Sequence, residues 1–177
     1  MRLFIAVNFS RPTLAALEAA REALRSAAGG RGSYTPCANL HLTLAFLGEA
    51  DKSRVKDAAE ALEAAAGAPF ELVFDRAGRF SRGREELWWA GGPENPALAA
   101  VQKRLCRELA ARGFELEARR FTPHVTLARR VPALGEAPAL FASPAAERVE
   151  AISLMRSQLE FRPPRYTELH RTLLRKR

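Results

Sequence analysis

All three histidines of the chain begin the same four-residue word, His-x-Thr-Leu, at His41, His124 and His170. Side chains alternate across a strand, so the histidine and the threonine of each word share one face. With an ordinary pKa of about 6.5, a histidine can give or take a proton near neutral pH. Repetition of the word therefore predicts a duplicated acid–base site in which the hydroxyls hold an anion.

The residues around the words separate the first two from the third. The first two have an apolar residue after the histidine and continue to Ala45 and Ala128. Strict alternation puts each alanine on the face of its histidine, where it would leave open space. In the third word Arg171 follows His170, and the same packing would bury an unpaired guanidinium. We expect the third word to lie outside the site.

Two histidines on facing strands suit an in-line displacement at phosphorus. One ring, of His41 or His124, takes a proton from the nucleophile and the other gives a proton to the leaving oxygen. Each role is typically worth roughly 10²–10⁴-fold in rate. The hydroxyls of Thr43 and Thr126 would donate to the non-bridging oxygens, where charge develops. The alternative is a pair of structural strand histidines without a catalytic role.

The composition fits one compact, folded unit. Of 177 residues, 47% are hydrophobic and 27% charged, which is ordinary for a globular protein and excludes a disordered one. The apolar stretch 1–9 is too short for a membrane span and lacks the features of a signal peptide, so we expect a cytoplasmic protein. Cys37 and Cys106 have neither zinc nor redox spacing, which predicts free thiols.

The charge of the chain suits a polyanionic partner. The formal net charge is +8 and the pI is near 10.4. Lysine and arginine facing phosphates release counterions on binding, which favours nucleic acid. The alternative is a coding bias, because arginine greatly outnumbers lysine and alanine is abundant.

The pattern of apolar residues and breakers predicts an α+β fold. Helices are expected over 11–28, 51–66 and 93–112, and a loop over 132–144. The expected strands cover 2–9, 40–47, 70–76, 85–90, 114–116, 124–130, 148–158 and 166–174. The glycine- and arginine-rich stretch between 70–76 and 85–90 predicts a turn that joins these two strands in a hairpin. Similar strands at 41 and 124 suggest two related lobes that face each other.

Two segments carry a resemblance to a known family. Residues 39–49, NLHLTLAFLGE, and residues 121–129, FTPHVTLAR, resemble the two motifs of the 2H phosphoesterases. Within these, the chain is similar to the RNA 2′,3′-cyclic phosphodiesterase branch, once called 2′-5′ RNA ligases, and its opening RLFIA also fits. The resemblance implies one domain over 1–177, made of two intertwined, pseudo-symmetric lobes. Antiparallel-rich sheets would surround a central cleft, with helices outside.

The resemblance also implies an activity and a set of site residues. The family opens a 2′,3′-cyclic phosphate at an RNA end to a 2′-phosphomonoester, without a metal or other cofactor. Carried over, His41 is the general acid, His124 the general base, and Thr43, Thr126 and Arg129 bind the phosphate. The pseudo-symmetry leaves open which ring is protonated, because a coupled pair has macroscopic pKa values.

The position of the arginine conflicts with strict alternation. Alternation favours Arg130 over Arg129 on the face of His124, so the resemblance requires the strand to end, twist or bulge there. We place Arg129 first and Arg130 second. Two departures from the family, Tyr34 for a tryptophan and Ala38 for an acidic residue, bear on which terminal nucleotide is preferred.

The expected partner is RNA with a 2′,3′-cyclic phosphate terminus, such as a tRNA fragment, or a nucleotide. We expect a monomer with no membrane contact and no obligate protein partner. Alternatives are 2′-5′ RNA ligation, and another phosphodiesterase substrate such as ADP-ribose cyclic phosphate or a 2′-5′ oligonucleotide. A non-catalytic basic module that binds RNA ends is a further alternative. A metalloenzyme is disfavoured, because the motifs lack convergent carboxylates or thiolates.

Overall fold

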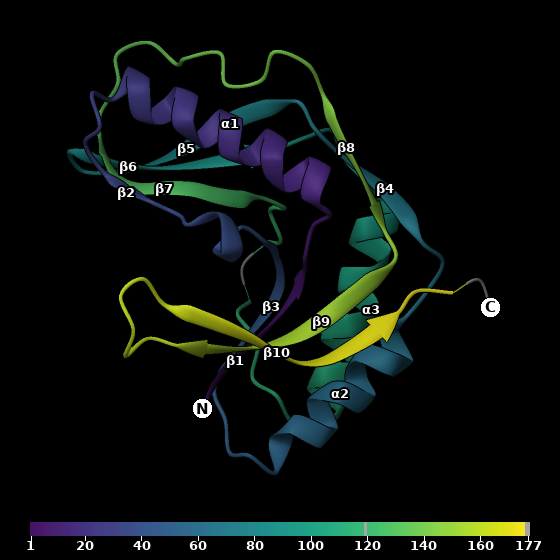
Figure 1. Cartoon of the computed structure of the whole chain (residues 1–177). Coiled ribbons are helices and arrows are strands. Elements are labelled where there is room, and N and C mark those ends of the chain that lie inside the picture. Colours follow the sequence, from purple (N-terminus) through teal and green to yellow (C-terminus); the bar gives the residue numbers. More distant parts are fainter. Residues whose placement is uncertain (119, 176–177) are drawn as a thin grey trace.

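The computed structural model describes residues 1–118 and 120–175, in which three helices pack against a large antiparallel sheet (Figure 1). The first half contributes β1 (Arg2–Val7), α1 (Arg11–Ala27), β2 (Ser33–Tyr34), the short 3-10 helix η1 (Cys37–Asn39), β3 (Leu42–Glu49) and α2 (Arg54–Ala65). The remainder contributes β4 (Phe70–Phe74), β5 (Arg76–Arg82), β6 (Glu85–Gly91), α3 (Pro96–Ala111), β7 (Val125–Pro132), β8 (Ala145–Val149), β9 (Ala151–Gln158) and β10 (Arg165–Leu173).

The sheet has two halves that meet at one point. Its strand order is β10-β9-β1-β3-β7-β6-β5, with β2 also pairing with β7, and β4 and β8 form a separate ribbon. Between β3 and β7 the pairing of the described residues consists of Leu42 with Val125. Helices α2 and α3 cover the half that contains β9 and β10, and α1 covers the half that contains β5 to β7 (Figure 1). The predicted bilobal α+β fold is confirmed.

The helices dock through apolar stripes with helical spacing. In α3 the stripe Leu98, Val101, Leu105 and Leu109 is at most 2% exposed, as its spacing predicts. The same argument applies to α1, whose buried residues Leu17, Ala20 and Leu24 recur every three or four positions. These contacts fix both helices on the face of the sheet that carries the core.

A buried carboxylate fixes the start of α1. Ser10 is the N-cap residue, but its hydroxyl makes no capping bond and instead donates to Glu147 on β8 over 2.6 Å. The backbone N–H of Ser10 donates to the same carboxylate, which is 6% exposed. A negative charge at this end also suits the helix dipole. The predicted helix start is confirmed, but the capping group comes from β8.

Strand partners differ from the expectation in the middle of the chain. The expected hairpin of 70–76 with 85–90 is wrong, because β4 ends at Phe74 and pairs with β8. The hairpin partner of β6 is β5, which covers the residues expected to form the turn. Only Gly83 and Arg84 connect these strands, with Gly83 at a φ of 67°. The alternation of apolar and polar residues shows which face of a strand is buried, but it does not show which strand lies beside it. The sequence therefore could not decide between β4 and β5 as the partner of β6.

Two other expected strands also differ. The stretch 148–158 is two strands on either side of Glu150, because β8 joins β4 whereas β9 joins β1 and β10. The expected strand at 114–116 is absent from the described residues. There Phe114 is buried, with the Arg54 guanidinium 4.3 Å from the centre of its ring. Its apolar character therefore reflects packing at the end of α3.

The close approach of Gly92, directly after β6, to the backbone of β4 predicts a strong effect of one added methyl group. A Cβ at Gly92 would overlap the carbonyl oxygen of Val73, whereas a Cβ at Gly135 would meet no atom within 4 Å. We expect Gly92→Ala to lower the free energy of unfolding by roughly 1–3 kcal/mol, because backbone must move. Urea denaturation measures this, with Gly135→Ala as the control. Equal urea midpoints for Gly92→Ala and Gly135→Ala would contradict the close contact between Gly92 and Val73.

Candidate active site

The histidines and threonines of the first two His-x-Thr-Leu words, which begin at His41 and His124, lie on one face of the sheet. Leu42 and Val125 form an antiparallel pair and point into the core, so their sequence neighbours point to the opposite face. Antiparallel geometry places each histidine opposite the threonine of the other word. We call this surface the histidine face, and its members are His41, Thr43, His124 and Thr126.

Both histidines make the same hydrogen bond. Nδ1 of His41 lies 2.7 Å from the carbonyl oxygen of Asn39, and Nδ1 of His124 lies 2.7 Å from that of Thr122. A carbonyl only accepts, so Nδ1 of each ring carries the hydrogen and donates it. Nε2 is then the nitrogen that exchanges a proton with a reactant in both halves. The backbone two residues upstream thus sets the tautomer and orients each ring.

The ring of His41 is enclosed by its neighbours. Its Nε2 lies 3.1 Å from the hydroxyl oxygen of Thr43. The ring of Phe4 is 4.9 Å away between centroids, and the ring of Tyr166 meets it edge-on at 5.3 Å. These aromatic neighbours come from β1 and β10, the strands on the same side of the junction.

The pKa of His41 is lowered. Burial is the main cause, because desolvation disfavours the charged ring. The carbonyl of Asn39 opposes this effect, and the positive charges of Arg129 and His124 add to it. Arg129 and His124 both belong to the second motif, so the second half of the chain influences the pKa of the histidine in the first motif.

A bulge in β7 puts Arg129 on the histidine face. Leu127 and Ala128 are both fully buried, so strict alternation is broken between them. The pairing of β7 with β6 shifts register over the same stretch. The next residue, Arg129, is exposed and acts electrostatically on His41, whereas Arg130 takes a left-handed φ of 54°. The strand therefore bulges where the resemblance requires it.

The first half has the same irregularity. Leu44 and Ala45 are buried in succession, and the register between β1 and β3 shifts there. Phe46, which is 46% exposed, then occupies the place that Arg129 has in the second half. The expectation that Ala45 and Ala128 leave space beside the histidines is wrong, because both bulges turn the alanines into the core.

Aromatic rings also surround His124. Phe80 meets it edge-on at 5.7 Å between centroids, and Trp89 lies 6.4 Å away. Trp89 lies over Gly78, its cross-strand partner, where any Cβ would overlap the indole ring. Its neighbour Trp88 faces the core and is 1% exposed. Alternation puts the adjacent Trp88 and Trp89 on opposite faces of their strand, but it gives no position for Phe80, which lies in the stretch expected to form a turn.

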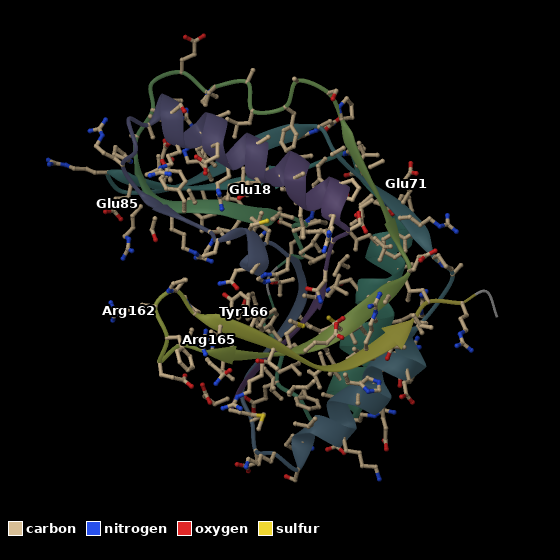
Figure 2. The ribbon with its side chains drawn as sticks, in the orientation of Figure 1. Glu18, Glu71, Glu85, Arg162, Arg165 and Tyr166 are labelled. Carbon is tan, nitrogen blue, oxygen red and sulfur yellow. The ribbon has the colours of Figure 1, made fainter. Side chains whose placement is uncertain are left out.

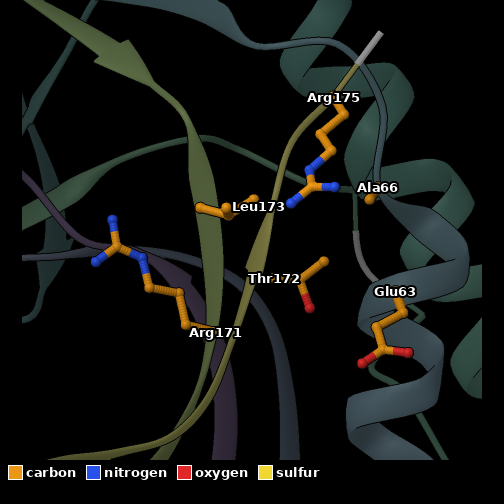
Figure 3. Close-up of a pocket in the computed structure, with 6 residues that line it drawn as sticks. All are labelled: Glu63, Ala66, Arg171, Thr172, Leu173 and Arg175. Atoms are coloured by element: carbon orange, nitrogen blue, oxygen red, sulfur yellow. The ribbon is translucent and has the colours of Figure 1, made fainter. Parts of the chain in front are cut away.

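The third His-x-Thr-Leu word, which begins at His170, points away from the histidine face and toward α2. Nε2 of His170 on β10 lies 3.2 Å from Oε1 of Glu63 on α2, and Thr172 is buried. Arg171 is exposed, so no guanidinium is buried here. A cavity of about 530 Å³ opens beside α2 on this side (Figure 3), lined by Glu63, Ala66, Arg171, Thr172, Leu173 and Arg175. The structure separates His170 from the histidine face, as the flanking residues predict.

Other expected features concern metals, thiols and membranes. Over residues 1–118 and 120–175, no three side chains of histidine, cysteine, aspartate or glutamate gather in a way that could hold a metal ion. Cys37 and Cys106 are free thiols, as their spacing predicts. None of the described helices is both long and apolar enough to cross a membrane.

Comparisons with known proteins identify the family. Residues 10–160 match the model of the 2′-5′ RNA ligase superfamily. A Thermus thermophilus relative named RNA 2′,3′-cyclic phosphodiesterase is 35% identical over 187 residues, covering 99% of this chain and 91% of the relative. A Geobacillus stearothermophilus relative with the same name is 35% identical over 136 residues, covering 71% of this chain and 42% of the relative. The chain therefore belongs to the 2′-5′ RNA ligase superfamily.

A solved structure agrees with this assignment. The crystal structure of Escherichia coli LigT complexed with 3′-AMP superposes with a TM-score of 0.85 at 28% sequence identity. The match covers 99% of this chain and 98% of LigT. The similarity thus extends over both halves of the sheet and includes the junction between them.

The electrostatic link between the two motifs can be measured. We expect Arg129→Gln to raise the pKa of His41, because the substitution removes a positive charge that disfavours the imidazolium. The pH titration of the His41 ring resonances by NMR gives this pKa. Arg130→Gln removes the same charge one residue away and serves as the control. A shift in the control alone would place Arg130, rather than Arg129, beside the histidine.

Proposed function

We propose that this chain hydrolyses RNA-terminal 2′,3′-cyclic phosphates to 2′-phosphomonoesters, with no metal ion in the reaction. The enzyme class predicted from the sequence is confirmed by several relatives named RNA 2′,3′-cyclic phosphodiesterase. The observation that carries the mechanism is the matched pair of histidines, each with Nδ1 held by a carbonyl, which leaves Nε2 as the nitrogen that can exchange a proton with the substrate. Two such rings on one face suit a reaction that needs one acid and one base.

In the proposed reaction His124 is the base and His41 is the acid. Nε2 of His124 takes a proton from water, and the water oxygen bonds to phosphorus. The bond from phosphorus to the 3′ oxygen breaks, and that oxygen takes the proton from Nε2 of His41. The products are a 2′-phosphomonoester and a free 3′ hydroxyl. Each proton transfer is typically worth roughly 10²–10⁴-fold in rate.

The remaining site residues are proposed to bind the phosphate. The hydroxyls of Thr43 and Thr126 would donate to its non-bridging oxygens, and Arg129 would neutralise its charge. The charge of Arg129 acts on His41, so an anion bound between them would offset the effect that lowers the pKa of this histidine. Substrate binding then favours the protonated His41 that the acid role requires.

Ligation is the second candidate. If the 5′ hydroxyl of a second RNA attacked the phosphorus in place of water, with the 3′ oxygen leaving, the two RNA ends would be joined through a 2′-5′ bond, and the family carries the name of that activity. Hydrolysis is preferred, because water is the more abundant nucleophile and the named relatives are phosphodiesterases. ADP-ribose cyclic phosphate, 2′-5′ oligonucleotides and binding without turnover remain alternatives. The single domain, the monomeric state, the cytoplasmic location and tRNA fragments as substrates stay predictions.

The reaction is tested with a nucleoside 2′,3′-cyclic phosphate and excess EDTA. We expect full activity after chelation and a 2′-monophosphate as the product, because the proposed chemistry uses only side chains. Chromatography against both monophosphate standards identifies the product. A 3′-monophosphate would overturn the assignment, and loss of activity that zinc or magnesium restores would overturn the metal-free mechanism.

The three histidines provide matched variants of one another. We expect His41→Ala and His124→Ala each to lower kcat by at least about 10²-fold, because each removes a proton-transfer group. His170→Ala should keep activity near that of the unmodified chain, since His170 contacts α2 instead of the histidine face. Steady-state kinetics and circular dichroism on all three variants measure this. Loss of turnover in a folded His170→Ala protein would show that the third word takes part.

A further inference from the structure

The connection between β9 and β10 is a projecting, basic segment. We call residues 156–166 the arginine arm, since this stretch contains three arginines and one glutamate. Figure 1 shows the hairpin extending away from α2 and α3, and Figure 2 shows Arg162 and Arg165 toward its tip. Nothing in the proposed chemistry uses these arginines, so their charge requires another explanation.

The arginines of the arm are free to bind an anion. Arg162 and Arg165 are exposed, and no carboxylate within residues 1–118 and 120–175 pairs with either of them. The Arg165 guanidinium lies 4.1 Å from the centre of the Phe161 ring. Glu160, the acidic residue of the arm, is within hydrogen-bond distance of Gln158. The arm therefore presents unpaired positive charge beside an aromatic ring.

The base of the arm is joined to His41. The ring of Tyr166 meets the ring of His41 edge-on at 5.3 Å. Asn39 connects them a second time, because its Nδ2 donates to the carbonyl oxygen of Pro164 over 2.8 Å and its own carbonyl accepts from His41. A chain bound at the histidine face is thus next to the arm as soon as it leaves the site.

Positive charge also lies between the histidine face and the arginine arm. The pKa of Tyr166 is raised by burial, and the charges of Arg129 and Arg2 act against this rise. Both arginines therefore lie near the tyrosine at the base of the arm. Positive charge runs from the second motif, past Tyr166, to the exposed arginines of the hairpin.

We propose that the arginine arm binds the RNA backbone on the 5′ side of the terminal nucleotide. The inference rests on the proposed function. An RNA that ends in a cyclic phosphate has all its other nucleotides on the 5′ side, so a surface next to the site meets only those phosphates. Guanidinium groups with an aromatic ring suit single-stranded RNA, through phosphate contacts and stacking. The preferred substrate is therefore an oligoribonucleotide rather than a mononucleotide.

The test compares two substrates on one variant. Arg162→Ala/Arg165→Ala is assayed with a nucleoside 2′,3′-cyclic phosphate and with an eight-nucleotide RNA that ends in the same group. We expect kcat/KM for the RNA to fall about tenfold through KM, with the mononucleotide unchanged. The slope of log kcat/KM against log salt for the RNA should weaken by about 1.4, since each phosphate contact on a single strand contributes about 0.7.

A control removes equal charge elsewhere. Lys103 and Arg107 are exposed on α3, so Lys103→Ala/Arg107→Ala lowers the net charge by the same amount. We expect both substrates to behave in this variant as they do in the unmodified chain. An equal loss for the RNA here would mean that net charge, instead of the arm, binds RNA, which overturns the inference.

The other outcomes are also decisive. If both substrates lose activity in the arm variant, the arm supports His41 and the inference is wrong. If neither changes, the arm does not bind RNA. If the unmodified chain hydrolyses neither substrate, the proposed function fails. Fluorescence anisotropy with the labelled RNA then tests the arm alone, and equal binding by the unmodified chain and the arm variant overturns it.

Discussion

The pairing of Leu42 with Val125 is the contact on which the site depends. These residues directly follow the two histidines, and they form the junction between the halves of the sheet over the described residues. Both side chains are buried, at 2% and 0% exposure. Because burial fixes their direction, it also fixes the opposite direction of the residue before each of them. The core thereby places two ionisable rings on one face of the sheet.

Both halves of the sheet have a bulge in the motif strand, but different side chains follow the two bulges. Each motif has a bulge after its threonine, marked by two buried residues in succession. The residue that follows is Phe46 in one half and Arg129 in the other. At this position the first half thus supplies an aromatic ring and the second half a positive charge. Unequal surroundings of two rings with matching hydrogen bonds suit an acid–base pair, whose members have different roles.

Much of the fold follows from periodicity, and its errors have one cause. The stripes of α1 and α3, the motif strands and the loop over 132–144 were predictable, because each depends on spacing within one segment. The pairing of β5 with β6, the division of 148–158 and the burial of Ala45 and Ala128 were not. These features depend on which strand lies alongside and on where the pairing register shifts. The alternation of residues within one segment carries no information on either.

The candidate site divides in the same way. The sequence by itself determined which residues could do chemistry, since the words at His41 and His124 combine an ionisable ring, a hydroxyl and an apolar partner for the core, and it separated His170 through Arg171. Only the tertiary structure decided that Nδ1 of each ring is held by a carbonyl, that the bulge turns Arg129 toward His41, and which aromatic rings enclose the pair. The physical reason is that residue type and spacing are properties of one strand. Tautomer, pKa and enclosure depend on groups that the fold brings from distant positions.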